Sequence, residues 1–312
     1  MMIYKKIGLV DTRQMLGDAL RGRYAVPGFN FYNMETLIAI MAACTDTKSP
    51  VILQVSKSAL HYMGPDTLVG MVAGTIKRTG VAVALHLDHG ADFQICKDCI
   101  DMGFSSVMID GSALAFDDNV ALTKSVMEYA RKHDVSVEAE LGALAGIEDE
   151  VSVTDTHYTD PADAVRFVKM TGVDSLAISI GTSHGAYKMK KITDTLRFDI
   201  LEKIAADIPD TPLVLHGASS VPQELVATIN KFGGTISGAR GIPVDQLRRA
   251  TGMNICKINV DSDARLAFTA AVRESLAADP ANFDPRKYLG TARDKMTGLY
   301  IDEIKNIMGS GN

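Results

Sequence analysis

Three histidines stand at or just beyond the ends of short runs rich in Val, Ile and Leu, and they could hold a metal ion. These residues are His89, His184 and His216. Three imidazoles that converge on one point, with a fourth coordination position left open, are typical of a catalytic zinc site. The three side chains come from distant segments, and no short motif links them. The sequence therefore predicts a metal site only if the fold gathers these run ends at one place.

Carboxylate, amide and hydroxyl side chains close the other apolar runs. They are Asn30, Ser56, Asp88, Asp110, Glu140, Asn259, Asp261 and Ser262. Strand ends often carry Asn, Gly, Ser or Asp because turns follow them. That tendency does not account for three histidines and a glutamate in equivalent positions, so we interpret the whole set as one functional site.

Glycine and hydroxyl residues gather near the ends of the last three runs, at residues 181–185, 216–220 and 259–262. Small residues let backbone N–H groups approach an anion, and the loops after the seventh and eighth strands of barrel proteins often bind phosphate. Each segment alone is a weak signal, because Gly-Ser turns are common. Together they predict a phosphate-binding site beside the histidines.

His86 and a pair of cysteines have simpler interpretations. His86 lies two residues before Asp88, so the two side chains share one face of a strand. We interpret His86 as a residue that supports the site from the core rather than as a ligand. Cys96 and Cys99 form a single C-x-x-C motif, whereas a zinc ribbon needs a second one. We expect both thiols to pack on a helix.

Eight apolar runs, separated by segments of helical period, must position these residues. Strands are predicted at residues 24–31, 50–57, 81–88, 105–111, 135–142, 174–181, 212–219 and 256–263. Runs that are apolar nearly throughout are typical of parallel strands buried on both faces. Strand–helix alternation repeated eight times predicts an α/β fold, a single (β/α)₈ TIM barrel, with all the polar run ends on one rim. The alternative is an open doubly wound sheet, but residues 28–31 lack the glycine fingerprint usual after its first strand.

Helix starts and long connections complete the predicted architecture. Asp92, Asp117 and the pair Asp160-Pro161 are predicted to begin helices. The connections 143–160 and 182–195 are longer than the rest, which is typical of lids and binding loops. We predict one barrel domain over residues 1–312. Within it, residues 279–312 form a C-terminal helical extension that packs on the barrel or on a partner subunit.

Composition excludes several classes of protein. The 312 residues are 46% hydrophobic and 22% charged, as in ordinary globular proteins, which argues against disorder. The net charge of −6 offers no basic surplus for nucleic acid or an anionic membrane surface. No apolar stretch approaches the about 18 residues of a transmembrane helix, and no signal peptide is expected. Four cysteines are too few for a disulfide scaffold, so the cytoplasm is the expected compartment.

These motifs resemble those of the class II, metal-dependent fructose-bisphosphate aldolases. The resemblance extends nearly end to end, and it rests on five ordered blocks between a start at residues 26–30 and an end at 283–289. The blocks are LHLDHG at 85–90, EAELG at 138–142, SHGAYK at 183–188, LHGASS at 215–220 and KINVDSD at 257–263.

The resemblance implies a role for each polar residue near the metal. His89, His184 and His216 would hold one catalytic Zn²⁺, with Asp110 and Glu140 beside it as supporting groups or an alternative metal position. Asp88 would exchange a proton with the C4 hydroxyl of the sugar. Glu148, in the loop after the fifth run, would be the mobile carboxylate that moves the C3 proton.

The resemblance also implies a ketose bisphosphate as the substrate. The residues expected to bind it are Asn30, Ser56, Gly185, Lys188, Gly217, Ser219, Asn259, Asp261, Ser262 and Arg265. Asp261 would orient a substrate hydroxyl, and Arg265 would grip the distal phosphate. The Asp-x-Asp-x-Arg pattern at 261–265 favours fructose 1,6-bisphosphate over its tagatose epimer. A monovalent cation, Na⁺ or K⁺, near the phosphate and a homodimer or homotetramer are further implications.

Three alternatives stay open from the sequence. A Schiff-base aldolase on the same fold would need a lysine inside a strand, and Lys257 shares parity with Asn259 and Asp261. A zinc hydrolase of the barrel type would usually carry His-x-His on the first strand, where Asn30 stands instead. A sugar-phosphate or metal-binding barrel without turnover would bind both ligands and leave them unchanged.

Overall fold

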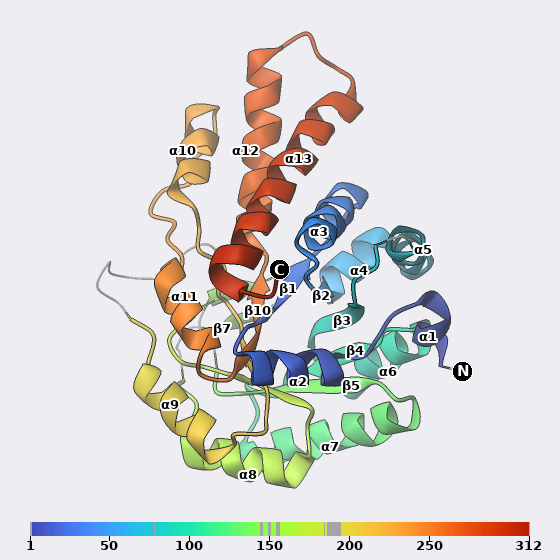
Figure 1. Ribbon diagram of the computed structural model, residues 1–312, viewed down its shortest axis with the longest axis vertical. Helices are drawn as coiled ribbons and strands as arrows, with labels where there is room; N and C mark the ends of the chain where they lie inside the picture. The colour runs from blue at the N-terminus through green and yellow to red at the C-terminus, as the bar shows by residue number, and fades with distance from the viewer. Residues whose placement is uncertain are drawn as a thin grey trace.

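A closed barrel of parallel strands forms the centre of the protein. The computed structural model describes residues 2–77, 79–143, 146–148, 151–153, 157–183, 185 and 195–311. The barrel strands follow one another around the closed sheet in the order β1-β10-β9-β8-β5-β4-β3-β2 (Figure 1). They are β1 (Val26–Asn30), β2 (Val51–Ser56), β3 (Val83–Gly90), β4 (Ser106–Ile109), β5 (Ser136–Leu141), β8 (Ser175–Ile178), β9 (Leu213–Leu215) and β10 (Ile255–Val260).

The predicted (β/α)₈ barrel is therefore confirmed, and each predicted run overlaps one strand. The open-sheet alternative is wrong because β1 pairs with β2 on one side and with β10 on the other, which leaves no edge. Closure brings the carboxyl ends of all the strands to one rim.

Helices surround the barrel. They are α1 (Ile3–Ile7), α2 (Thr12–Gly22), α3 (Met34–Thr47), α4 (Lys57–Met63), α5 (Pro65–Ile76), α6 (Phe93–Met102), α7 (Phe116–Lys132), α8 (Pro161–Thr171), α9 (Phe198–Asp207), α10 (Gln223–Lys231), α11 (Val244–Thr251), α12 (Ser262–Ala278), α13 (Pro285–Glu303) and a final π-helical turn, η1 (Ile304–Met308). No helix among the described residues is long and apolar enough to cross a membrane.

Two of the three predicted helix starts are N-caps. Asp92 accepts a hydrogen bond from the Ile95 amide at the start of α6, and Asp160 caps α8 ahead of Pro161. The third predicted start is two residues late: the N-cap of α7 is Ala115, and Asp117 lies in the first turn of the helix. There its carboxylate favours the positive end of the helix dipole without bonding the backbone.

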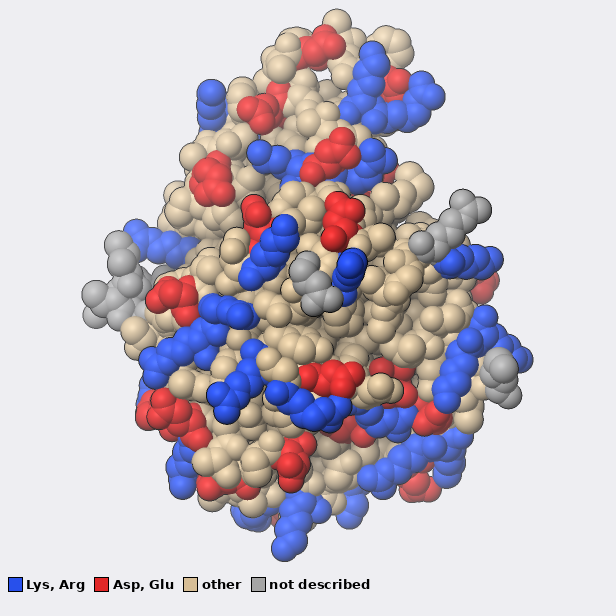
Figure 2. All heavy atoms as spheres, viewed as in Figure 1, with Lys and Arg blue, Asp and Glu red and all other residues tan. Residues whose placement is uncertain are grey.

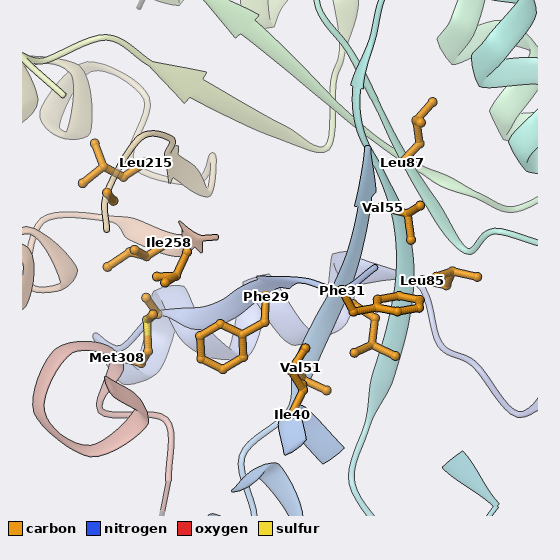
Figure 3. Close-up of a cluster of buried hydrophobic side chains, with 14 of the residues drawn as sticks. Phe29, Phe31, Ile40, Val51, Val55, Leu85, Leu87, Leu215, Ile258 and Met308 are labelled. Carbon is orange, nitrogen blue, oxygen red and sulfur yellow. The ribbon is translucent and has the colours of Figure 1, made fainter. Parts of the chain in front are cut away.

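The outer face of the barrel is apolar, and Phe29 of β1 packs there with Phe31 and Ile40 against α3 (Figure 3). The inner face changes along the barrel axis. At the amino end, Val26 and Ile52 pack on Met15 and other residues of α2, which closes that end. Alternate residues of each strand share the inward face. Toward the carboxyl ends of the strands, the residues at these inward positions are polar.

The connection predicted as a loop at residues 143–160 contains an antiparallel hairpin. It consists of β6 (Gly146–Glu148) and β7 (Val151–Val153). The sequence predicts a long connection here but not this hairpin, and the alternation of Val151, Ser152 and Val153 is typical of a short strand. Most of the second long connection, residues 186–194, lies outside the described residues.

The C-terminal segment returns to the start of the barrel. α12 and α13 lie side by side and project beyond the strands (Figure 1), and α13 also packs along α3. The Tyr300 ring lies 4.4 Å, centroid to centroid, from Phe29. After η1, the Met308 carbonyl oxygen accepts a hydrogen bond from the Ala25 amide, 3.0 Å away, just before β1.

Lys and Arg side chains alternate with Asp and Glu over the face shown in Figure 2. That face offers no field of a single sign, in agreement with the small net charge.

Replacing Gly90 with alanine is expected to destabilise the barrel. A Cβ at this position would lie 2.5 Å from the Met108 carbonyl oxygen and 2.7 Å from Cys96 Sγ, so β4 or α6 would have to move. Overpacking of this kind costs about 1–3 kcal/mol. The midpoint of urea unfolding measures the change.

Gly70→Ala is the matched control, because a Cβ there meets no atom within 4 Å. Alanine inside a helix gains about 0.5–1 kcal/mol over glycine. Equal unfolding midpoints for the two variants would contradict this account of Gly90.

Candidate active site

An irregularity in β3 brings Asp88 and His89 to the same site. Consecutive residues of a regular strand point to opposite faces. Here the pairing of β3 with β4 shifts register between Leu87 and Gly90, and His89 has a left-handed φ of 50°. As a result Asp88 Oδ2 lies 2.8 Å from Asn30 Nδ2, inside the barrel, while His89 Nδ1 lies 2.8 Å from Asp110 Oδ2 on the same rim.

His89 and His216 face each other across the rim, with His89 Nε2 2.9 Å from His216 Nδ1. Each ring has a carboxylate on its other nitrogen: Asp110 on His89 Nδ1, and Glu138 on His216 Nε2 at 2.7 Å. Carboxylates accept hydrogen bonds, so those outer nitrogens carry the protons. The two inner nitrogens therefore turn lone pairs toward one point, and a positive charge there, a proton or a metal ion, relieves their repulsion.

The surrounding charges favour that positive charge. Burial opposes the charged form of His89, but the bond to Asp110 and the nearby Asp88 and Glu140 outweigh it and raise the pKa of His89 well above its usual value. Burial likewise opposes ionisation of Asp110, yet its bond to His89 holds the Asp110 pKa below the usual range. Burial lowers the pKa of His216 despite its bond to Glu138, so that ring stays neutral.

These residues fit a metal ion by their chemistry. Asp88, His89 and His216 bring ligand atoms within 4.8 Å of one another, and so do His89, Asp110 and Glu140. Imidazoles with buried carboxylates behind them are the usual surroundings of a catalytic ion. The third predicted ligand, His184, lies outside the described residues.

Asn30 and Asn259 hold the carboxylate of Asp88 from both sides. Asn30 Nδ2 donates to Oδ2 at 2.8 Å, and Asn259 Nδ2 lies 3.4 Å from Oδ1. Gln54 fixes Asn30 in turn, with its Nε2 2.9 Å from Asn30 Oδ1. Ser56 lies opposite Asp88 in the β2–β3 register, but its hydroxyl also caps α4. The Asp88 carboxylate is thus held in place by the side-chain amides of Asn30 and Asn259.

The loops after β8 and β9 approach each other closely at Gly217. A Cβ at this position would lie 2.5 Å from the Ser183 carbonyl oxygen, and Gly217 has a φ of 58°. Gly185 also has a positive φ, 80°, and Ser219 is buried at the end of the second loop. The structure thus brings three predicted phosphate residues to adjoining loops. Lys188, which is predicted with them, lies outside the described residues, as does the side chain of Glu148.

Asp263 of α12 fixes the loop that follows Ser219. Its carboxylate accepts hydrogen bonds from the Ser220 amide at 2.7 Å, the Ser220 hydroxyl at 2.9 Å and the Val221 amide at 2.8 Å. Val221 has a φ of 51°, which is strained for a β-branched residue. The bonds to Asp263 offset that strain and hold Ser219 in place.

Asp261 and Arg265 form an ion pair one turn apart at the start of α12. Arg265 Nε lies 2.8 Å from Asp261 Oδ2, and its guanidinium lies 5.2 Å from the Tyr32 ring centroid. The Arg265 side chain is half exposed, so it stands at the outer part of the rim. Ser262 is the first residue of α12, between the two loops of the site and this pair.

Sequence reasoning gave no role to Gln54, Glu138 or Asp263, and it considered Lys257 only as a Schiff-base lysine. Two of these residues could have been found from the alternation of side chains along a strand. Glu138 precedes Glu140 by two residues, and Lys257 precedes Asn259 by two, so each lies on the same inward face as a predicted site residue. His86 is buried, as expected, with Nδ1 2.8 Å from Ser106 Oγ. Cys96 and Cys99 are buried free thiols on α6.

The fold is a parallel barrel, and one rim carries facing imidazoles, buried carboxylates and loops that contain glycine. These features define a barrel enzyme with a candidate metal site. The chain belongs to the class-II fructose-bisphosphate aldolase family: residues 10–312 match the family model described as "Fructose-bisphosphate aldolase class-II". The recognition of this family from the sequence is thereby confirmed, and so is the prediction of a lyase.

Curated relatives cover nearly the whole chain. A fructose-bisphosphate aldolase of Treponema pallidum is 50% identical over 99% of this chain and 99% of its own length. One from Giardia intestinalis is 47% identical over 97% and 94%, respectively. Among solved structures, the YdjI aldolase of Escherichia coli K12 aligns with a TM-score of 0.79 at 29% identity, and it covers 97% of this chain and 98% of its own. Members of this family depend on a metal ion and act on small molecules.

Glu303→Gln is expected to change how stability depends on pH. Burial, followed by the charge of Asp263, raises the pKa of the Glu303 carboxyl well above its usual value, and no donor among the described residues reaches its oxygens. Because the folded-state pKa is raised, stability is fully present below the unfolded pKa of about 4.5 and falls as pH rises. The variant removes that loss, so it gains stability over wild type at pH 8 relative to pH 5.

Urea unfolding at the two pH values measures this difference. Asp294→Asn, a change at an exposed residue of the same helix, is the control and is expected to follow wild type. A pH dependence of Glu303→Gln identical to that of wild type would show that Glu303 ionises freely in the folded protein.

Proposed function

We propose that this chain catalyses the reversible aldol cleavage of fructose 1,6-bisphosphate to dihydroxyacetone phosphate and glyceraldehyde 3-phosphate, with one Zn²⁺ as its metal. The observation that carries the proposal is the position of Asp88 beside the facing nitrogens of His89 and His216, in a barrel of the class-II aldolase family. His184 is the third proposed ligand, and Asp110 and Glu140 support the site from behind.

The amides around Asp88 suit it to accept the proton of the C4 hydroxyl. They hold the carboxylate at both oxygens, beside the imidazoles of His89 and His216. As that proton leaves, the C3–C4 bond breaks, C4 becomes an aldehyde, and the bonding electrons move through C3 toward the C2 oxygen. When bound, Zn²⁺ acts as a Lewis acid that stabilises the charge developing on that oxygen. Glu148 is proposed to return a proton to C3.

The proposed phosphate contacts position the sugar at both ends. Gly185, Gly217, Ser219, Asn259 and Ser262, with Lys188, are proposed to bind the phosphate of the dihydroxyacetone half, and a Na⁺ or K⁺ ion is proposed to lie near it. At the other end Arg265 is proposed to bind the second phosphate, and Asp261 a hydroxyl. Asn30 and Ser56 line the site between them. Orientation at two ends contributes to the rate alongside the metal.

The assembly and location of the enzyme are proposed as well. We propose a homodimer or homotetramer in the cytoplasm. We also propose that residues 1–312 form one barrel domain, whose 279–312 extension packs on the barrel or on a partner subunit. The contacts of α13 with α3, and of Ala25 with Met308, support the first of those two positions.

Cleavage of fructose 1,6-bisphosphate is expected to depend on the metal. Activity of the pure protein should disappear with a chelator and return when Zn²⁺ is added, because the charge on the C2 oxygen is then stabilised again. Tagatose 1,6-bisphosphate, the C4 epimer, is the matched substrate and should react more slowly. Activity that survives the chelator would favour the Schiff-base alternative with Lys257. Bound zinc with no cleavage of either sugar would overturn the substrate.

Two variants are expected to separate the metal from the base. Asp88→Ala should keep stoichiometric zinc and lose about 10²–10⁴-fold in turnover, since it removes the proposed proton acceptor alone. His216→Ala should lose both zinc and turnover. Metal content after dialysis and steady-state rates measure the two effects.

His133→Ala is the control, because that imidazole stacks on Tyr129 at the end of α7. It should change neither zinc content nor turnover. Full turnover by Asp88→Ala would refute the assignment of the base.

A further inference from the structure

A lysine is buried inside the barrel, on the amino-terminal side of the candidate metal site formed by Asp88, His89 and His216. Lys257 of β10 is fully buried, and it occupies the inward position just before Asn259. Its Nζ lies 2.7 Å from Glu138 Oε2. The other oxygen of that carboxylate, Oε1, lies 2.7 Å from His216 Nε2. An unbroken chain of contacts thus runs from the ammonium to a proposed metal ligand.

The lysine also fixes a second imidazole on its other side. Lys257 Nζ lies 3.4 Å from His86 Nε2, and an ammonium can only donate, so Nε2 of His86 is the acceptor. His86 Nδ1 then carries the proton and donates it to Ser106 Oγ at 2.8 Å. The contact with the lysine therefore sets the tautomer of His86 as well.

A buried ion pair is a costly way to fill a core. Desolvation of two charges offsets most of their attraction, and well-packed apolar residues of similar volume often serve stability as well or better. The barrel fills its amino-end layer in that apolar way, with Val26, Ile52, Ala84 and Cys256. The charged pair directly beneath the histidines therefore calls for a reason other than stability.

The identity of the group facing His216 provides that reason. A carboxylate can only accept, so it compels His216 to carry its proton on Nε2 and to present Nδ1 as an acceptor, which lies 2.9 Å from His89 Nε2 and 3.0 Å from Asn259 Nδ2. The ammonium neutralises the carboxylate in a dry layer and holds one of its oxygens, which leaves the other for the ring.

We propose that Lys257 is a positioning residue that, through Glu138, fixes the proton of His216 on Nε2 and thereby turns Nδ1 toward the metal. The proposal rests on the proposed function, because the metal is the ion assigned there. It places Lys257 outside the covalent chemistry, since its ammonium is directed at Glu138 and His86.

The dissociation constant for Zn²⁺, measured by competition with a chromophoric chelator, tests the proposal without turnover. Lys257→Met removes the charge at nearly constant length. It is expected to weaken zinc binding about 10–100-fold, the usual effect of losing an outer partner of a metal ligand. Unchanged affinity in this variant would overturn the proposal.

Glu138→Gln, alone and combined with Lys257→Met, gives the direction of the effect, and the combination removes both charges of the buried pair. In Glu138→Gln, Lys257 takes the amide oxygen, so the amide N–H₂ faces His216 Nε2 and drives the ring proton to Nδ1, the metal-facing atom. Zinc binding should weaken strongly. In Lys257→Met/Glu138→Gln the amide can turn its oxygen to the ring, so zinc affinity should recover in part.

A lysine that merely filled space would give no such recovery, so a double variant that binds zinc no better than Glu138→Gln would also overturn the proposal. Ser106→Ala is the matched control, because it changes the same buried layer without touching the chain from Lys257 to His216. It should keep wild-type zinc affinity. Wild-type protein that fails to bind zinc would instead refute the proposed function itself, which separates the two failures.

Discussion

The structure depends on two imidazole nitrogens that face each other at 2.9 Å, His89 Nε2 and His216 Nδ1. Neither could hold this position alone, because two lone pairs at that distance repel unless a positive charge lies between them. Each ring is therefore held from behind by a carboxylate, Asp110 or Glu138. The rim of the barrel therefore favours a positive charge between the two rings, and the neighbouring carboxylates stabilise that charge.

The interior of the barrel is arranged in layers along its axis. An apolar layer on α2 closes the amino end, the Lys257–Glu138 pair fills the next layer, and Asp88, His89 and His216 lie above it. The order of the layers matters, because each layer restricts the conformations that the side chains of the next layer can adopt. The apolar layer excludes water from the ion pair, and the ion pair fixes the protons of the rings above.

Much of this was predictable from the sequence, for physical reasons. Parallel strands buried on both faces must be apolar, so the eight runs were visible, and barrel closure then placed their polar ends together. The register shift of β3 was not predictable, because it arises from pairing with β4 and from the φ of His89. Glu138 and Lys257 stood on the inward face by parity, but only the folded distances reveal them as a pair. The hairpin β6–β7 was hidden because its strands are only three residues each.

The junction of β1 with the C-terminal tail governs how this chain can fold. β1 pairs with β10, and the Ala25 amide bonds to the carbonyl of Met308, almost at the other end of the chain. During synthesis the first strand therefore emerges long before β10, and one of its edges stays open until β10 can pair with it. Pairings of such sequence separation form slowly, and an open strand edge invites association with other chains. Closure of the barrel thus depends on a pairing between distant parts of the chain rather than on any local helix, and until that pairing forms the open edge of β1 is exposed to association with other chains.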